Sequence, residues 1–145
     1  SKPTVERWER SEDVIRGPIV PFLKMLQKYP EYEQEVKVPE KVWPLRIWYM
    51  YDQDVCTLID VNERERKLKI KNYTDKIMFR AFGVMEEPDY NQYIEFLESR
   101  CFPESRDKMK LILKDLGLPF YDPIMIIEKT EGRMAEDDFW IRIER

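Results

Sequence analysis

The stretch 45–71 decides the fold, because it holds three short runs of β-forming residues separated by polar turns. Leu45–Tyr51 reads LRIWYMY, and its alternate positions share one face of an expected strand. After a polar turn, Val55–Val61 (VCTLIDV) supplies a second strand, and Lys67–Lys71 (KLKIK) alternates apolar residues with lysines as a third. Such short turns predict an antiparallel meander, and an outward row of lysines is typical of an edge strand.

Two further segments bear on the sheet. Residues 77–85 (IMFRAFGVM) are apolar without a clear period, so they predict either a fourth strand or a buried crossing segment. Near the end of the chain, Phe139, Ile141 and Ile143 alternate with polar or amphipathic residues and predict a final strand that joins the meander.

The N-terminal part predicts two helices. The first covers Thr4–Arg16, and Gly17-Pro18 ends it, because proline disfavours the helical region for the residue before it. The second begins around Pro21 and ends at Pro30. Its apolar positions follow i, i+3, i+4 and i+7 spacing: Phe22, Met25, Leu26 and Tyr29.

The last third of the sequence predicts three helices with clear start and stop signals. One begins at Pro88 or Asp89, and the next has Ser105 as N-cap and Gly117 just beyond its end. The third begins at Asp122-Pro123 and stops near Gly132. Together these patterns predict an α+β fold, a small antiparallel β-meander with helices packed on one side and a helical N-terminal extension.

The same patterns divide the chain into residues 1–41, a helical extension and linker, and residues 42–145, an α+β module. Its 145 residues carry 29 acidic against 25 basic side chains, a net charge of −4, with no histidine and only four glycines. The lack of histidine excludes His-dependent catalysis and His-ligated metals, and no glycines cluster into a phosphate-binding loop. We expect no enzymatic activity and no cofactor or metal, with carboxylate acid–base chemistry as the remaining enzymatic alternative.

The cysteines and the N-terminal sequence bear on the compartment. Cys56 and Cys101 fit no CxxC or zinc pattern, and we expect both to be small buried residues without a disulfide. The first thirty residues hold no long apolar run, so neither a signal peptide nor a transmembrane helix is predicted. We therefore expect a cytoplasmic protein without a membrane partner.

Two basic sets are candidates for nucleic-acid contact. The first lies on and before the third strand: Arg64, Arg66, Lys67, Lys69 and Lys71. Outward cations on a two-stranded ribbon can contact successive phosphates of a nucleic acid. The acidic neighbours Glu63 and Glu65 reduce the positive charge of this set, however, and protection of the sheet edge also explains the lysines. The second set belongs to the helix pair around Pro103: Arg100, Arg106, Lys108, Lys110 and Lys114.

The aromatic and the acidic clusters each allow more than one interpretation. The tryptophans can stack on bases, pack in the core or meet a partner protein, and we expect partner contact at Trp8, Trp43 and Trp48. The carboxylates of 136–138 can hold Mg²⁺ or Ca²⁺, but an Asp before a strand is usually a turn residue or an ion-pair partner.

Residues 45–145 hold a set of short motifs. Residues 99–106 (SRCFPESR) are followed by 113–118 (LKDLGL), then by Gly132, an acidic loop and Phe139-Trp140-Ile141. In this order and spacing the motifs resemble the N-terminal module of HipA-like proteins of Firmicutes. The resemblance implies the module of a toxin–antitoxin kinase without the kinase part, which would follow the last strand.

The positions carried over from the family motif are Pro103, Arg106, Gly117, Gly132, Asp137 and Trp140. Each also has a structural explanation, since Pro103 and Ser105 suit a turn and cap and the glycines suit positive φ. We expect Arg106 and Asp137 to pair and to fasten the second of the last helices to the final strand.

The sequence thus predicts a non-catalytic protein-interaction module of a bacterial or mobile-element protein, related to toxin–antitoxin systems. The N-terminal helices and exposed aromatics would contact the partner protein. The alternatives are a regulator that contacts nucleic acid and an inhibitor of a bacterial defence nuclease.

Overall fold

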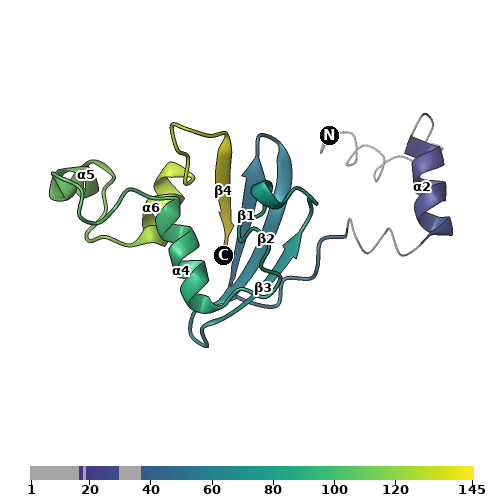
Figure 1. Ribbon diagram of the computed structural model, residues 1–145, viewed down its shortest axis with the longest axis horizontal. Helices are drawn as coiled ribbons and strands as arrows, with labels where there is room; N and C mark the ends of the chain where they lie inside the picture. Colours follow the sequence, from purple (N-terminus) through teal and green to yellow (C-terminus); the bar gives the residue numbers. More distant parts are fainter. Residues whose placement is uncertain (1–16, 18, 30–36) are drawn as a thin grey trace. The chain divides into compact units, whose positions relative to one another are not determined.

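The computed structural model describes residues 17, 19–29 and 37–145. The chain divides into two compact units, Ser1–Pro39 and Glu40–Arg145. The helix predicted over 4–16, with Trp8, lies outside the described residues. In the first unit, α2 (Ile19–Lys28) forms over the predicted apolar stripe (Figure 1).

The second unit is built on a four-stranded antiparallel sheet in the order β3-β2-β1-β4 (Figure 1). Its strands are β1 (Leu45–Tyr51), β2 (Asp54–Asn62), β3 (Lys67–Asn72) and β4 (Phe139–Glu144). The predicted α+β class is confirmed, and the final strand joins the meander beside β1.

Residues 77–85 are not a strand. They contain a short 3₁₀ helix, η1 (Ile77–Phe79), followed by turns. Phe82 is buried in the core, and the backbone N–H of Ala81 donates to the hydroxyl of Thr57 (3.1 Å). Because this segment is anchored by a buried ring and a side-chain hydrogen bond, it crosses the end of the sheet without pairing to a strand.

Two helices share a core with one face of the sheet: α4 (Tyr90–Ser99) and α6 (Pro123–Thr130). Tyr93 from α4 and Ile126 from α6 are fully buried, as are Ile47 of β1 and Ile59 of β2. Apolar side chains at alternate strand positions therefore meet the apolar faces of both helices, as the α+β prediction requires.

The helix starts at Asp89 and Asp122 are where the sequence predicts them. The Asp89 carboxylate accepts from the backbone N–H of Gln92 (2.9 Å), and the Gln92 side chain accepts from the N–H of Asp89 (2.8 Å). This reciprocal capping box fixes the start of α4. The Asp122 carboxylate accepts from the N–H of Met125 (2.9 Å) and caps α6 in the same way.

The prediction that Ser105 caps the next helix is wrong. Helix α5 (Met109–Asp115) begins four residues later, with Lys108 as an N-cap in the left-handed region (φ 61°) and no side-chain cap. The N–H of Arg106 donates to the carbonyl of Pro103 (3.0 Å), so the residues after Pro103 form a turn first. Ser105 is exposed in that turn.

Gly117 ends α5 as predicted. It has φ +70°, and the N–H of the next residue, Leu118, donates back to the carbonyl of Leu113 (2.8 Å). This is a Schellman closure, in which a residue of positive φ lets the chain turn over the last carbonyls of the helix. Buried Leu113 and Leu118 attach the end of α5 to the core.

The opposite face of the sheet has its own buried cluster, formed by Trp48, Met50 and Leu58. Beside it, the Arg46 guanidinium on β1 donates to both carboxylate oxygens of Asp60 on β2 (2.6 and 2.7 Å). Both side chains are almost completely buried. A two-point charge-assisted pair of this kind fixes the register of the two central strands.

Candidate interaction surfaces

The apolar stripe of α2 is exposed. None of the ten residues of this helix is buried, and the stripe residues Phe22 and Met25 are exposed, at 43% and 48%. Lys24 and Gln27 lie on the opposite side of the helix, so α2 is amphipathic. An amphipathic helix that buries nothing is typical of a segment that docks into a partner's groove.

A second exposed apolar group lies on the segment 77–85. Met78 is 84% exposed and Val84 71%, and Ile77 and Met85 are exposed as well. Phe79 and Phe82 of the same segment pack inward, where the Phe79 ring lies against those of Tyr51 and Phe139. The segment therefore has an anchored inner side and an apolar outer side.

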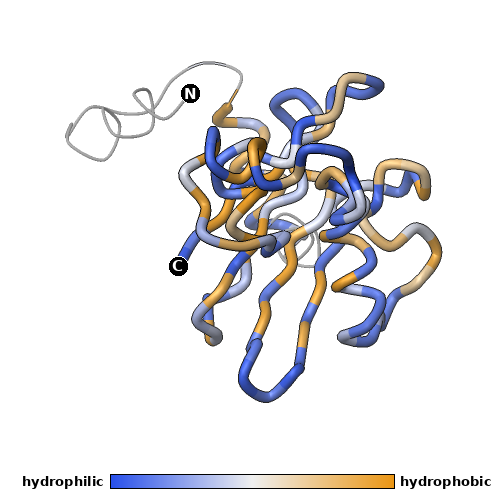
Figure 2. Tube along the Cα trace, turned by 90° about the vertical axis from the view of Figure 1, so that its left-hand side faces the viewer, coloured by the Kyte–Doolittle hydropathy of each residue, from blue (hydrophilic) through white to orange (hydrophobic). Residues whose placement is uncertain are grey.

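The basic set of the third strand is divided among several neighbours. Lys67 pairs with Glu65 (2.8 Å), which raises the pKa of the ammonium and lowers that of the carboxyl. Arg66 donates to Asn91 (3.2 Å) and lies over the Tyr90 ring of α4. Figure 2 shows the charged turn before β3 at the bottom of the view, below strands in which hydrophobic and hydrophilic residues alternate.

The remaining members of that set are exposed Arg64 and Lys69 and half-buried Lys71, which lies over the Tyr73 ring. Lys67, Lys69 and Lys71 share one face of β3, but Lys69 stands opposite Asp60 in the register. The structure therefore does not bring the five cations together as one patch of unopposed charge.

Trp48 is not a surface residue, so its predicted partner contact is wrong. It is 8% exposed, its indole N–H donates to Glu144 (3.3 Å), and the guanidinium of Arg142 lies over its ring at 4.6 Å. Trp48 packs in the cluster on the sheet's second face because even-numbered β1 residues point there. Trp43, by contrast, is half-buried just before β1.

Trp140 is also half-buried, and its indole N–H donates to the carbonyl of Asp52 (2.7 Å) at the β1–β2 turn. Arg133 lies over its ring at 5.1 Å. The side chain thus ties β4 to the neighbouring hairpin, which is a structural role.

The arginine that pairs with Asp137 is Arg100, and the predicted pairing with Arg106 is wrong. Arg100 donates through both Nη atoms to the Asp137 carboxylate (2.7 and 3.0 Å). Its Nε and Nη2 donate to the carbonyl of Gly132 (3.1 and 2.8 Å), and Nη2 also reaches the carbonyl of Phe139 (3.0 Å). Arg100 is 7% exposed, so the guanidinium is buried, whereas the side chain of Asp137 is 31% exposed.

The position of each arginine explains the difference. Arg100 is the C-cap of α4, where its side chain extends toward the loop before β4. Arg106 lies beyond the Pro103 turn, exposed, with its guanidinium over the Phe102 ring at 5.9 Å. The dipeptide Ser99-Arg100 offered the alternative arginine in the sequence, but nothing in the pattern ranked it above Arg106.

Gly132 has a close-packed position in the same network. It is buried with φ +58°, and a Cβ there would lie 3.2 Å from Ile141 Cδ1 and 3.4 Å from Arg100 Cβ. Both the left-handed backbone and the close approach of Arg100 and Ile141 to this position therefore require glycine.

Of the acidic residues 136–138, Asp137 serves the fold. Asp137 accepts from Arg100 and from the N–H of Phe139 (3.0 Å), and the Arg100 hydrogen bonds lower the pKa of its carboxyl. Within residues 17, 19–29 and 37–145, no three Cys, Asp or Glu side chains are grouped as a metal site would need.

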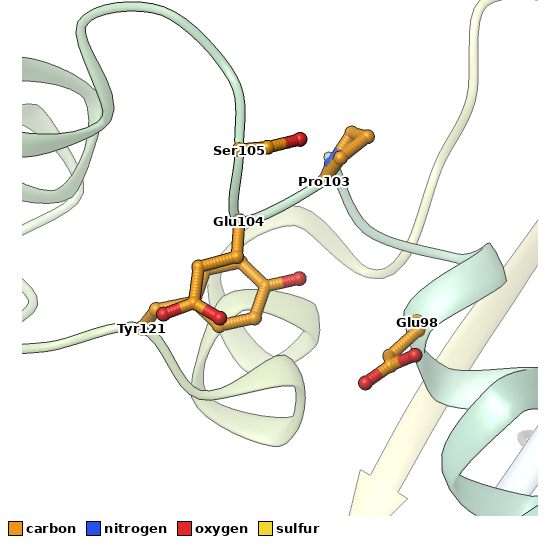
Figure 3. A pocket seen from close by; sticks show the side chains of 5 residues that line it. All are labelled: Glu98, Pro103, Glu104, Ser105 and Tyr121. Atoms are coloured by element: carbon orange, nitrogen blue, oxygen red, sulfur yellow. The ribbon is translucent and has the colours of Figure 1, made fainter.

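A pocket of about 640 Å³ opens beside the Pro103 turn (Figure 3). Its lining residues are Glu98, Pro103, Glu104, Ser105 and Tyr121. The Tyr121 hydroxyl donates to the carbonyl of Phe102 (3.0 Å), and burial raises its pKa to about 12. Two predicted motif residues, Pro103 and Ser105, thus line a pocket together with two acidic residues, Glu98 and Glu104.

The nearby thiol is inert. Cys101 and Cys56 are both free and buried, as expected, and burial raises the pKa of Cys101 to about 11. A thiol of such high pKa is almost wholly protonated at neutral pH, which makes it a poor nucleophile.

Across the described segments, no helix has both the length and the apolar character needed to cross a membrane. Comparison with family models, curated proteins and solved structures found no match to this chain.

Proposed function

We propose that this protein is a non-catalytic protein-interaction module that docks the apolar stripe of α2 into a groove on a partner protein. The observation that carries the proposal is the exposure of Phe22 and Met25 in the apolar stripe of a helix that buries none of its residues. Exposed apolar side chains in a continuous stripe are costly in water, and covering them on a partner repays that cost.

The chemistry of the rest of the chain supports binding over catalysis. The sequence has no histidine, the buried thiols are protonated, and the pocket beside the Pro103 turn offers two carboxylates and a tyrosine of raised pKa. The resemblance to the HipA-like module supports a bacterial or mobile-element, cytoplasmic protein related to toxin–antitoxin systems.

The test uses two double variants of the full chain with the same change in net charge. Phe22→Asp with Met25→Asp places two acidic groups in the stripe. Lys24→Gln with Gln27→Asp makes the same charge change on the opposite side of the helix. The parent protein first captures its partner from the natural host. We expect this partner to bind the second variant normally. Its Kd for the first variant rises at least about tenfold, as for loss of an aromatic anchor.

Equal binding of the partner to both variants contradicts the proposal. So does co-purification of nucleic acid with no stoichiometric protein, since that outcome favours the nucleic-acid regulator. Melting curves of the two variants serve as the folding control, because the substituted side chains are exposed or partly exposed.

A further inference from the structure

The backbone groups on the outer edge of β4 can be accounted for one by one. Ile141 donates its N–H to the carbonyl of Glu131 (2.7 Å), so this N–H points away from β1. Even-numbered residues bond in the opposite direction, toward β1 and the turn after it: the carbonyl of Asp138 accepts from the N–H of Asp52 (3.3 Å). Backbone direction alternates along a strand, so the odd-numbered residues of β4 direct their N–H and C=O groups to the outer edge.

The first half of that edge is closed by the chain itself. The N–H of Phe139 donates to Asp137, the carbonyl of Phe139 accepts from Arg100, and the N–H of Ile141 is bonded to Glu131. The carbonyl of Ile141 and both backbone groups of Ile143 come next on the same edge. None of these groups has a hydrogen-bond partner among the described residues.

A groove of about 410 Å³ lies beside these open groups. Ile127, Glu128 and Glu131 line it from the α6 side, β4 lines it through residues 140–143, and Arg145 closes it. Arg145 donates to Glu128 (2.8 Å), so the rim is polar, while the lining residues Ile127 and Ile141 are almost completely buried.

We propose that the open half of the β4 edge binds a short extended peptide segment of a partner protein by β-strand addition. Alternating donors and acceptors at strand spacing complement an extended backbone. The three open groups can form at most three backbone hydrogen bonds, against about ten in the interface of a typical stable complex, so this edge suits a short peptide segment and not a dimer. This surface belongs to the α+β unit and does not depend on the α2 stripe.

The two edges of the sheet differ in this respect. β3 carries the lysines at 67, 69 and 71, and like charges along an edge oppose the approach of another strand. β4 carries Arg142 and Glu144 of opposite charge on its corresponding face. The β3 edge therefore serves as the internal control for peptide binding.

The test is NMR of the ¹⁵N-labelled full chain with a capped peptide, lysine-threonine-valine-threonine-valine-lysine. A control peptide has the same sequence with its four central residues N-methylated. We expect the first peptide to shift the amide of Ile143 saturably, with a Kd of roughly 1 mM, and to slow its hydrogen exchange. The N-methylated peptide gives no shift, and the amide of Ile141 keeps the protection that Glu131 provides.

Ile143→Pro removes the outward N–H and leaves the N–H groups that bond to β1, so it abolishes peptide binding while β1 amides keep their shifts. If this variant fails to fold, the comparison of the unmodified and the N-methylated peptide with the parent protein tests the proposal by itself. The proposal is overturned if the Ile143 amide is protected without peptide, or if the N-methylated peptide binds equally. Equal shifts along β3, or a concentration-dependent dimer through β4 in sedimentation, would also overturn it.

Discussion

Arg100 and Asp137 form a two-point ion pair with Nη to Oδ distances of 2.7 and 3.0 Å, and the same guanidinium also binds the carbonyls of Gly132 and Phe139. One side chain at the end of α4 therefore fixes the loop that leads into β4. The strength of this attachment can be measured.

Arg100→Ala should lower the free energy of unfolding by about 3 kcal/mol, because it leaves a carboxylate and two carbonyls without their buried donor. Arg106→Ala, at an exposed position, should change it by less than about 0.5 kcal/mol. Urea denaturation of both variants measures the difference, and equal losses would contradict the assignment of Arg100 as the anchor.

Stability should depend on pH through Asp137. Its pKa lies below the ordinary value of 3.8 because Arg100 donates hydrogen bonds to the charged form. The contribution is complete well above pH 3.8 and is lost as the pH falls through the folded-state pKa. The stability advantage of the parent protein over Asp137→Asn should therefore shrink from about pH 5 downward. A difference that stays constant to pH 2 in urea titrations would argue against this coupling.

Tyr93 has a fully buried ring, and its hydroxyl has no hydrogen-bond partner in the described structure. Burial raises the pKa of this hydroxyl, so it stays neutral. Tyr93→Phe removes an unsatisfied polar atom and keeps the packing, and should leave stability unchanged or raise it by up to about 1 kcal/mol. A clear destabilisation in thermal unfolding would show that the hydroxyl has a partner.

Two glycines of similar backbone conformation provide a matched pair. Gly117→Ala should cost about 1 kcal/mol for the left-handed backbone alone, because no atom lies within 4 Å of the added Cβ. Gly132→Ala meets Ile141 and Arg100 as well, and should cost about 2–3 kcal/mol. Chemical denaturation compares them, and a smaller loss at position 132 would be inconsistent with the close packing of Arg100 and Ile141 around it.

Alkylation should report the burial of Cys101, whose pKa is about 11. At pH 8 iodoacetamide should label this thiol only as fast as the protein opens, since the folded thiol is buried and protonated. Mass spectrometry across a urea series measures the rate. Rapid labelling without urea would disprove the expected burial.

The sequence predicts most of the elements because their signals are local. Alternation along 45–51, the Asp89 and Asp122 caps and the Gly117 closure depend on residues within a few positions of each other. The failures depend on tertiary contacts. The choice between Arg100 and Arg106 for Asp137, and the burial of Trp48 on the second face, are set by which segments meet in three dimensions. Ser105 fails as a cap for a local reason, since the Pro103 turn continues past it.

The place of β4 beside β1 has a consequence for the order of folding. Trp48 and its hydrogen-bond partner Glu144 are 96 residues apart in sequence, so this edge of the sheet closes only when almost the whole chain is present. During synthesis the hairpins of β1, β2 and β3 can form first. The edge of β1 that later pairs with β4 stays unpaired until β4 is made. A ribosome-bound chain that stops before residue 139 should therefore hold a three-stranded intermediate, which is the stage most exposed to aggregation and to chaperones.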